Sequence, residues 1–125
     1  MMTYPRFDGA DIWQRFSAED QARIGAAAVE LLVTAHGCQL AEERDDKVFM
    51  RAGDEAGPGL MATLDNHVGR ALLAISHAAV DQPHLPSRIG EICTSCGCSE
   101  ADACASGCSW VAPGLCSSCL EGMRQ

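Results

Sequence analysis

The chain has 125 residues, of which 47% are apolar and only 5% are aromatic, and its formal net charge is −8. This length accommodates one compact domain plus a small appendage, and the negative charge argues against non-specific binding to nucleic-acid phosphates or anionic membranes. Because alanine and glycine are frequent and aromatic residues are rare, we expect a core of helices with small side chains.

The chain begins without an apolar run and reaches Asp8 early, which is unlike a secretory signal peptide. The longest apolar stretches lie around residues 24–35 and 71–80, and both are too short and too interrupted to span a bilayer. We therefore expect a cytoplasmic protein with no membrane contact. In that reducing compartment, metal binding explains eight cysteines better than disulfides do.

A first long helix is predicted to begin after Ser17, whose hydroxyl can cap the first turn, and to end near His36. Gly37 suits the left-handed position that commonly follows a helix. Before this helix, Asp8 is predicted to cap a short turn. The apolar residues of the helix recur at helical spacing: Ile24, Ala28, Leu31, Leu32 and Ala35.

A second helix is predicted to begin near Pro58 or Leu60, since proline suits the first helical position, and to end near Val80. Its apolar residues form one stripe, so we expect it to pack against the first helix. Between the two helices, residues 47–51 are predicted to form a short strand, and residues 54–59 are predicted to form a loop.

The distribution of cysteines predicts the domain organisation. Seven of the eight fall within residues 93–119, and Pro83 and Pro86 precede them in a segment that stops a helix. We therefore expect an α+β, mainly helical protein. Its two-helix-based N-terminal domain would cover residues 1–86, and a C-terminal cysteine-rich, zinc-ribbon-like module would cover residues 87–125.

Two C-x-x-C pairs bracket the cysteine-rich segment: Cys93 with Cys96, and Cys116 with Cys119. Each pair places two sulfurs on one side of a tight turn, and Gly97 lets the backbone amides turn toward the thiolates. Structural zinc prefers four thiolates in a tetrahedron, and such a site would help a segment with almost no core of its own to fold. The sequence therefore predicts a zinc site at these four cysteines.

The inner cysteines, Cys98, Cys104 and Cys108, leave several interpretations open. They bind a second metal with a fourth ligand from elsewhere, such as Cys38, His84 or a carboxylate; they join the first site through bridging sulfur; or they are free or paired thiols. His84 is the best candidate among the non-cysteine ligands. An iron–sulfur cluster is the alternative to zinc, although no spacing matches the bacterial ferredoxin pattern.

The cysteine-rich segment resembles a tail found in many small proteins of bacteriophages and prophages. The resemblance covers about a quarter of the chain, and its motif runs through Cys93-x-x-Cys96-Gly97-Cys98, Ala103-Cys104, Gly107-Cys108-Ser109-Trp110-Val111 and Leu115-Cys116-x-x-Cys119. Because family members attach this tail to different N-terminal parts, the resemblance implies a stabilising or docking module. It also implies a mobile-element protein that acts in the host cytoplasm. Trp110 is expected to pack over the module as its only large apolar group.

No catalytic motif stands out, and a four-thiolate zinc site has no open position for chemistry, so we expect no enzymatic activity. We favour a protein that inhibits or modulates a host macromolecule through protein–protein contacts. A CRISPR or other defence complex is an example, because an acidic surface can compete for its basic nucleic-acid channels.

The alternative function is a small nucleic-acid-binding or transcriptional regulator that uses the zinc ribbon. A ribbon that binds phosphates should carry several lysines or arginines, but residues 92–125 contain a single base, Arg124. Direct nucleic-acid binding is therefore the weaker hypothesis. Self-association into a homo-oligomer is left open.

Overall fold

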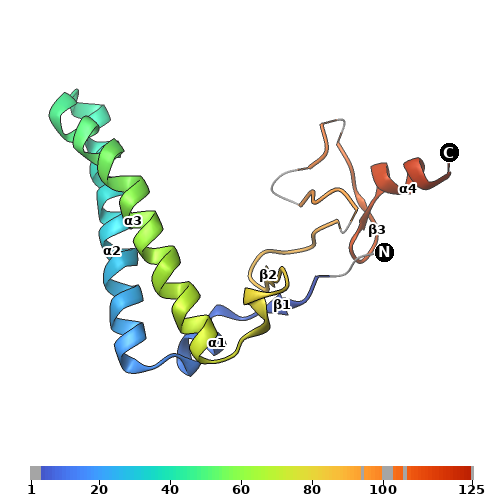
Figure 1. Ribbon diagram of the computed structural model, residues 1–125. Helices are drawn as coiled ribbons and strands as arrows, with labels where there is room; N and C mark the ends of the chain where they lie inside the picture. The colour runs from blue at the N-terminus through green and yellow to red at the C-terminus, as the bar shows by residue number, and fades with distance from the viewer. Residues whose placement is uncertain (1–3, 94, 100–102, 106, 125) are drawn as a thin grey trace. The chain divides into compact units, whose positions relative to one another are not determined.

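The computed structural model describes residues 4–93, 95–99, 103–105 and 107–124. The chain divides into two compact units (Figure 1). We call Trp13–Asp81 the helical unit, and we call Met1–Ile12 together with Gln82–Gln125 the cysteine unit. The fold is mainly helical with short strands near the clustered cysteines, as predicted. The predicted domain boundary at residue 86 stays a prediction.

Three helices follow one another in the first part of the chain: α1 (Gly9–Arg15), α2 (Ala18–Arg44) and α3 (Lys47–Ala74). Helices α2 and α3 run in opposite directions and pack side by side as a hairpin (Figure 1). The Asp8 carboxylate accepts a hydrogen bond from the amide of Ala10 at 3.0 Å, which confirms the predicted cap of the short first helix.

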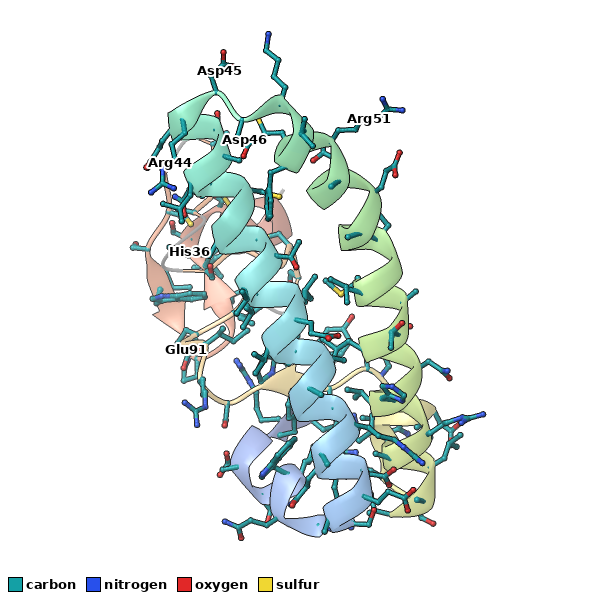
Figure 2. All side chains as sticks on the ribbon, turned by 90° about the vertical axis from the view of Figure 1, so that its left-hand side faces the viewer. His36, Arg44, Asp45, Asp46, Arg51 and Glu91 are labelled. Atoms are coloured by element: carbon teal, nitrogen blue, oxygen red, sulfur yellow. The ribbon has the colours of Figure 1, made fainter. Side chains whose placement is uncertain are left out.

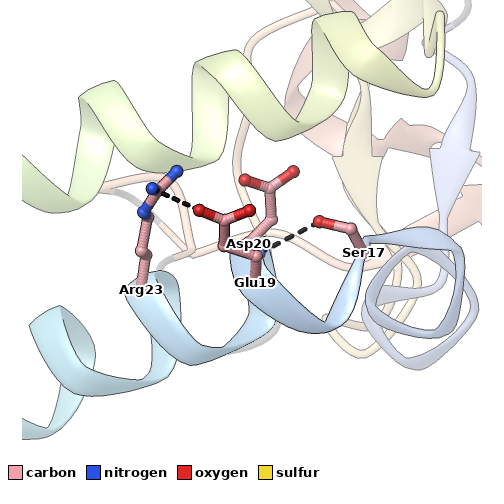
Figure 3. Close-up of polar contacts among 4 residues, drawn as sticks. All are labelled: Ser17, Glu19, Asp20 and Arg23. Atoms are coloured by element: carbon pink, nitrogen blue, oxygen red, sulfur yellow. Dashed lines mark hydrogen bonds and ion pairs between the residues drawn. The ribbon is translucent and has the colours of Figure 1, made fainter.

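The start of α2 is also confirmed. The Ser17 hydroxyl accepts a hydrogen bond from the backbone N–H of Asp20 at 3.1 Å, which satisfies one of the amides left unpaired at a helix start (Figure 3). Glu19 and Arg23 form an ion pair one turn apart, with 2.5 Å between nitrogen and oxygen. Both side chains are exposed, so this pair contributes little to stability.

The predicted end of the first helix near His36 is wrong, because α2 continues through this point to Arg44. Gly37 does not terminate the helix. A Cβ atom at Gly37 would lie 2.6 Å from a ring carbon of Phe49 in α3, so glycine is required here for the close approach of the two helices.

The turn between α2 and α3 is made by two acidic residues, Asp45 and Asp46 (Figure 2). Asp45 adopts the left-handed conformation with φ 54°, which short polar side chains tolerate. The amide of Asp46 donates to the carbonyl of Ala41 at 2.8 Å, and its carboxylate accepts from the amide of Phe49 at 3.1 Å. The same dipeptide therefore ends one helix and begins the next.

The predicted strand at residues 47–51 and the predicted loop at residues 54–59 are both wrong, because α3 covers both ranges. The ring of Phe49 packs against α2 at Gly37, and this tertiary contact overrides the β-propensity of the segment. Pro58 lies inside α3 instead of starting it. Because proline has no N–H, α3 lacks one backbone hydrogen bond at this point.

Helix α3 ends at Ala74, earlier than the predicted end near Val80. Ser76 adopts a left-handed conformation with φ 53°, and the amide of His77 donates to the carbonyl of Leu72 at 3.0 Å. This pairing closes the last turn as a Schellman motif. A short 3₁₀ helix, η1 (Ala78–Val80), follows.

The helical hairpin buries mostly small residues and exposes several larger aliphatic ones. Its buried residues in α2 and α3 are Ile24, Ala27, Ala41, Gly53 and Ala71. Three aliphatic side chains on α2 are exposed to 61%, 68% and 63%: Val29, Leu32 and Val33. The close packing of glycine and alanine thus leaves an apolar surface uncovered on α2.

Among the described residues, one helix meets the length and composition expected of a membrane span. It is α2, in which an 18-residue window has a mean hydropathy of 1.3 and is 17% buried. The predicted apolar stretch near residues 24–35 therefore belongs to a longer helix than the sequence indicated. Helices of soluble proteins pass the same test, so this finding alone does not place α2 in a membrane.

In the cysteine unit, strand β1 (Arg6–Phe7) pairs in parallel with β2 (Leu85–Pro86). The Arg6 guanidinium donates to three backbone carbonyls at the end of β2 and just after it, at 3.1–3.4 Å: Pro86, Ile89 and Gly90. Strands β3 (Trp110–Ala112) and β4 (Leu115–Cys116) form an antiparallel hairpin, and helix α4 (Ser117–Arg124) follows it directly. The N-terminal strand thus ties the start of the chain to the segment that leads into the cysteines.

Candidate metal centre

The first C-x-x-C pair lies in a tight turn closed by backbone hydrogen bonds. The amide of Gly97 donates to the carbonyl of Cys93 at 2.8 Å, and the amide of Cys93 donates to the carbonyl of Cys98 at 2.9 Å. Gly97 has φ +81°, a conformation that favours glycine. This turn places the thiols of Cys93 and Cys96 on the same side, as the sequence predicted.

The second pair spans the junction of a strand and a helix. Cys116 ends β4 and Cys119 lies in the first turn of α4. The junction is fixed on both sides, because the amide of Ser117 donates to the carbonyl of Ser109 at 2.7 Å and the Ser117 hydroxyl accepts from the amide of Ser109 at 3.0 Å. A hairpin and a helix start therefore position this pair.

The four outer thiols converge. The sulfurs of Cys93, Cys96, Cys116 and Cys119 all lie within 4.8 Å of one another. The Sγ atoms of Cys93 and Cys119 are 3.6 Å apart, and those of Cys96 and Cys116 are 3.8 Å apart. A zinc ion with four sulfurs at about 2.3 Å would separate them by about 3.8 Å. The four cysteines can therefore hold a metal ion.

The first cysteine of each pair is set up to be a thiolate. Backbone amides, chiefly that of Cys116, lower the pKa of Cys93 to about 6 despite its burial. The amide of Cys119 is the main cause that lowers the pKa of Cys116. Because thiolates and not thiols bind metals, these amides favour the ligand form before any ion binds.

Three other thiols have raised pKa values, because of contact with neighbouring thiols or because of burial. Thiols at Cys108 and Cys96 are the main causes that raise the pKa of Cys104 to about 11. The pKa of Cys98 is raised mainly by burial. The pKa of Cys119 is raised mainly by contact with the thiol of Cys96. A divalent cation among these sulfurs reverses this preference, because it stabilises every thiolate that contacts it.

The inner cysteines join the same cluster. Cys98 and Cys104 form a second group with Cys96 and Cys116, in which all four sulfurs lie within 4.8 Å of one another. The sulfur of Cys108 lies 3.7 Å from that of Cys98. All eight cysteines are among the described residues, and all are free thiols. Seven thiols from one segment of the chain therefore surround one small volume.

Neither Cys38 nor His84 belongs to the two groups of thiols found among the described residues. Cys38 lies in the helical unit, half-buried, where its sulfur is in contact with the position that a Cβ atom at Gly53 would occupy. The His84 ring nitrogen Nδ1 lies 2.8 Å from the carbonyl of Gln82. Their proposed roles as ligands of a second metal stay predictions.

Two residues support the site without belonging to it. Trp110 packs against the cysteine cluster, which confirms its predicted position. Glu91 was not singled out in the sequence, yet its carboxylate accepts a hydrogen bond from the amide of Gly114 at 2.9 Å. Gly114 has φ +75° in the β3–β4 turn, so Glu91 links this turn to the chain just before Cys93. A single acidic residue carries no sequence signal for such a contact.

The left-handed turn at Gly97 gives a direct prediction. Substituting Gly97→Ala should weaken the affinity for added Zn²⁺ by about tenfold, because a Cβ atom costs about 1–2 kcal/mol in this conformation. No atom lies within 4 Å of the Cβ position, so the effect comes from the backbone alone. Competition with a chromogenic chelator measures it.

Gly9→Ala is the control, since its Cβ position is also open and φ is not left-handed. Gly97→Asn should lose less affinity than Gly97→Ala, because asparagine tolerates this conformation better. Equal affinities for wild type and Gly97→Ala would show that the turn is not needed to form the site.

Comparison with protein-family models, curated proteins and solved structures found no match to this chain.

Proposed function

We propose that this protein is a non-enzymatic binding protein whose cysteine unit is folded by zinc in a ribbon-like module. The observation that carries the proposal is the convergence of four thiols from two C-x-x-C turns, with all sulfurs within 4.8 Å. Four thiolates fill the tetrahedral coordination of zinc and leave no position for a substrate or a reactive water. Such a site stabilises a fold and supplies no catalytic centre.

The cysteine unit has few other sources of stability. The buried apolar residues between Gln82 and Gln125 are Cys93, Cys98, Leu115 and Cys116 among those described, and three of these four are thiols. A segment with so little hydrocarbon core does not fold without an additional cross-link. Zinc supplies that cross-link in a reducing compartment, where disulfides do not persist.

The proposed partner is a protein. Val29, Leu32 and Val33 form an exposed apolar surface on α2, and contiguous surfaces of this kind commonly mark interaction sites. A shallow groove beside them is lined by Val29, Glu30, Val33, Thr34, Ala56 and Leu60. The net charge of −8 favours a basic protein surface over phosphates. A host nucleoprotein complex, such as a defence effector, has the required chemistry.

The metal content of the purified protein tests the proposal. We expect at least one zinc ion per chain by mass spectrometry under non-denaturing conditions, and no visible colour. A brown protein with iron and sulfide in place of zinc would replace the zinc module with an iron–sulfur cluster. Salt-sensitive retention on a DNA column would overturn the preference for a protein partner and favour the nucleic-acid regulator.

A further inference from the structure

The two groups of thiols in the cysteine unit are not separate. The first group holds Cys93 and Cys119, the second holds Cys98 and Cys104, and both include Cys96 and Cys116. The two shared sulfurs are 3.8 Å apart. A pair of sulfurs at this distance can form the common edge of two tetrahedra, one on each side.

Two further sulfur–sulfur distances fit the same geometry. The sulfur of Cys96 lies 3.9 Å from that of Cys104 in the second group and 3.8 Å from that of Cys116, and the Cys93–Cys119 distance in the first group is 3.6 Å. All three distances are close to the tetrahedral edge of about 3.8 Å expected around zinc. Each group therefore contains sulfur pairs at the spacing that a four-thiolate zinc site requires.

We propose that the protein binds two metal ions of the zinc type in one thiolate cluster, with Cys96 and Cys116 bridging them. Cys93 and Cys119 complete the first site, and Cys98 and Cys104 complete the second. This inference rests on the proposed function, because it takes the first site to be a zinc site. It adds a second ion and assigns its ligands.

Two bridging sulfurs also explain how seven cysteines can supply enough ligands for two metal ions. Two independent four-thiolate sites need one more cysteine than the seven between Cys93 and Cys119, whereas bridging sulfurs need no ligand from outside this segment. The inner loop is also built as a turn, since Gly107 has φ +78° and its amide donates to the carbonyl of Cys104 at 2.7 Å. Cys108 lies beside Cys98 and is the seventh thiol of the cluster, next to the four of the second site.

Loading the 125-residue chain with ¹¹³Cd²⁺ in place of zinc tests whether two metal ions share the cluster. We expect two cadmium ions per chain by mass spectrometry and two ¹¹³Cd resonances, split by coupling through the bridging sulfurs. Cys104→Ser should lose one ion and the splitting. The matched controls Cys38→Ser and His84→Ala should keep both.

The outcomes separate the two proposals. One bound ion in the wild-type protein would overturn the binuclear cluster and leave the proposed zinc module standing, whereas no bound ion would overturn both. Two ions without mutual coupling, or the loss of one ion in Cys38→Ser or His84→Ala, would show two separate sites and overturn the bridging. The wild-type spectrum decides these points even where a serine variant fails to fold.

Discussion

Removal of metal with an excess of chelator is expected to unfold the cysteine unit while most of the helical signal survives. Structural zinc contributes about 10–16 kcal/mol in small zinc-binding folds, and such segments are unfolded without it. The unit cannot replace that contribution, because between Gln82 and Gln125 its described buried apolar residues are mostly thiols. The helices α2 and α3 form a compact unit by themselves, and none of the seven clustered cysteines lies in it.

Two spectra of the same sample check this expectation. Far-ultraviolet circular dichroism should change little on chelation, whereas amide resonances of residues 92–119 should lose their dispersion in a ¹H–¹⁵N correlation spectrum. Cys116→Ser should reproduce the loss without chelator, because it removes a buried ligand. Cys38→Ser is the matched control and should leave the spectrum dispersed. Retained dispersion after complete removal of metal would mean that another interaction folds this unit.

The candidate site could be predicted in part because its local geometry is encoded locally. A C-x-x-C turn brings two sulfurs together whatever surrounds it, so the outer four cysteines and Gly97 were identified from spacing alone. The role of the inner cysteines was not determined by spacing. Whether Cys104 faces Cys96 depends on how the loop between them folds back, which is a tertiary property.

The helical hairpin, too, could be predicted only where its structure depends on neighbouring residues in the sequence. Ser17 and Asp8 were predicted correctly because a cap depends on the two or three residues that follow it. Gly37 was misinterpreted because glycine serves both helix ends and close helix contacts, and only the position of Phe49 decides between them. The hydrogen bonds of Asp46 to the backbone of Ala41 and Phe49 were not predicted, because the first helix was predicted to end near His36.

Substitution of Gly53 by valine is expected to destabilise the helical unit by about 2–3 kcal/mol. Gly53 is buried in α3, and a Cβ atom there would overlap the sulfur of Cys38 on α2. To relieve the overlap, the Cys38 sulfur must rotate to another rotamer or the two helices must separate, and either change costs free energy. Urea denaturation followed by circular dichroism measures the change in the free energy of unfolding.

Gly59→Val is the matched control on the same helix, because Gly59 is exposed and its Cβ position is open. Valine has a higher helix propensity than glycine, so this variant should be as stable as wild type within about 0.5 kcal/mol. The double variant Cys38→Ala/Gly53→Val should recover more than about 1 kcal/mol relative to the sum of the single changes. If Gly53→Val proves as stable as Gly59→Val, the close contact between α2 and α3 at Cys38 does not hold the hairpin together.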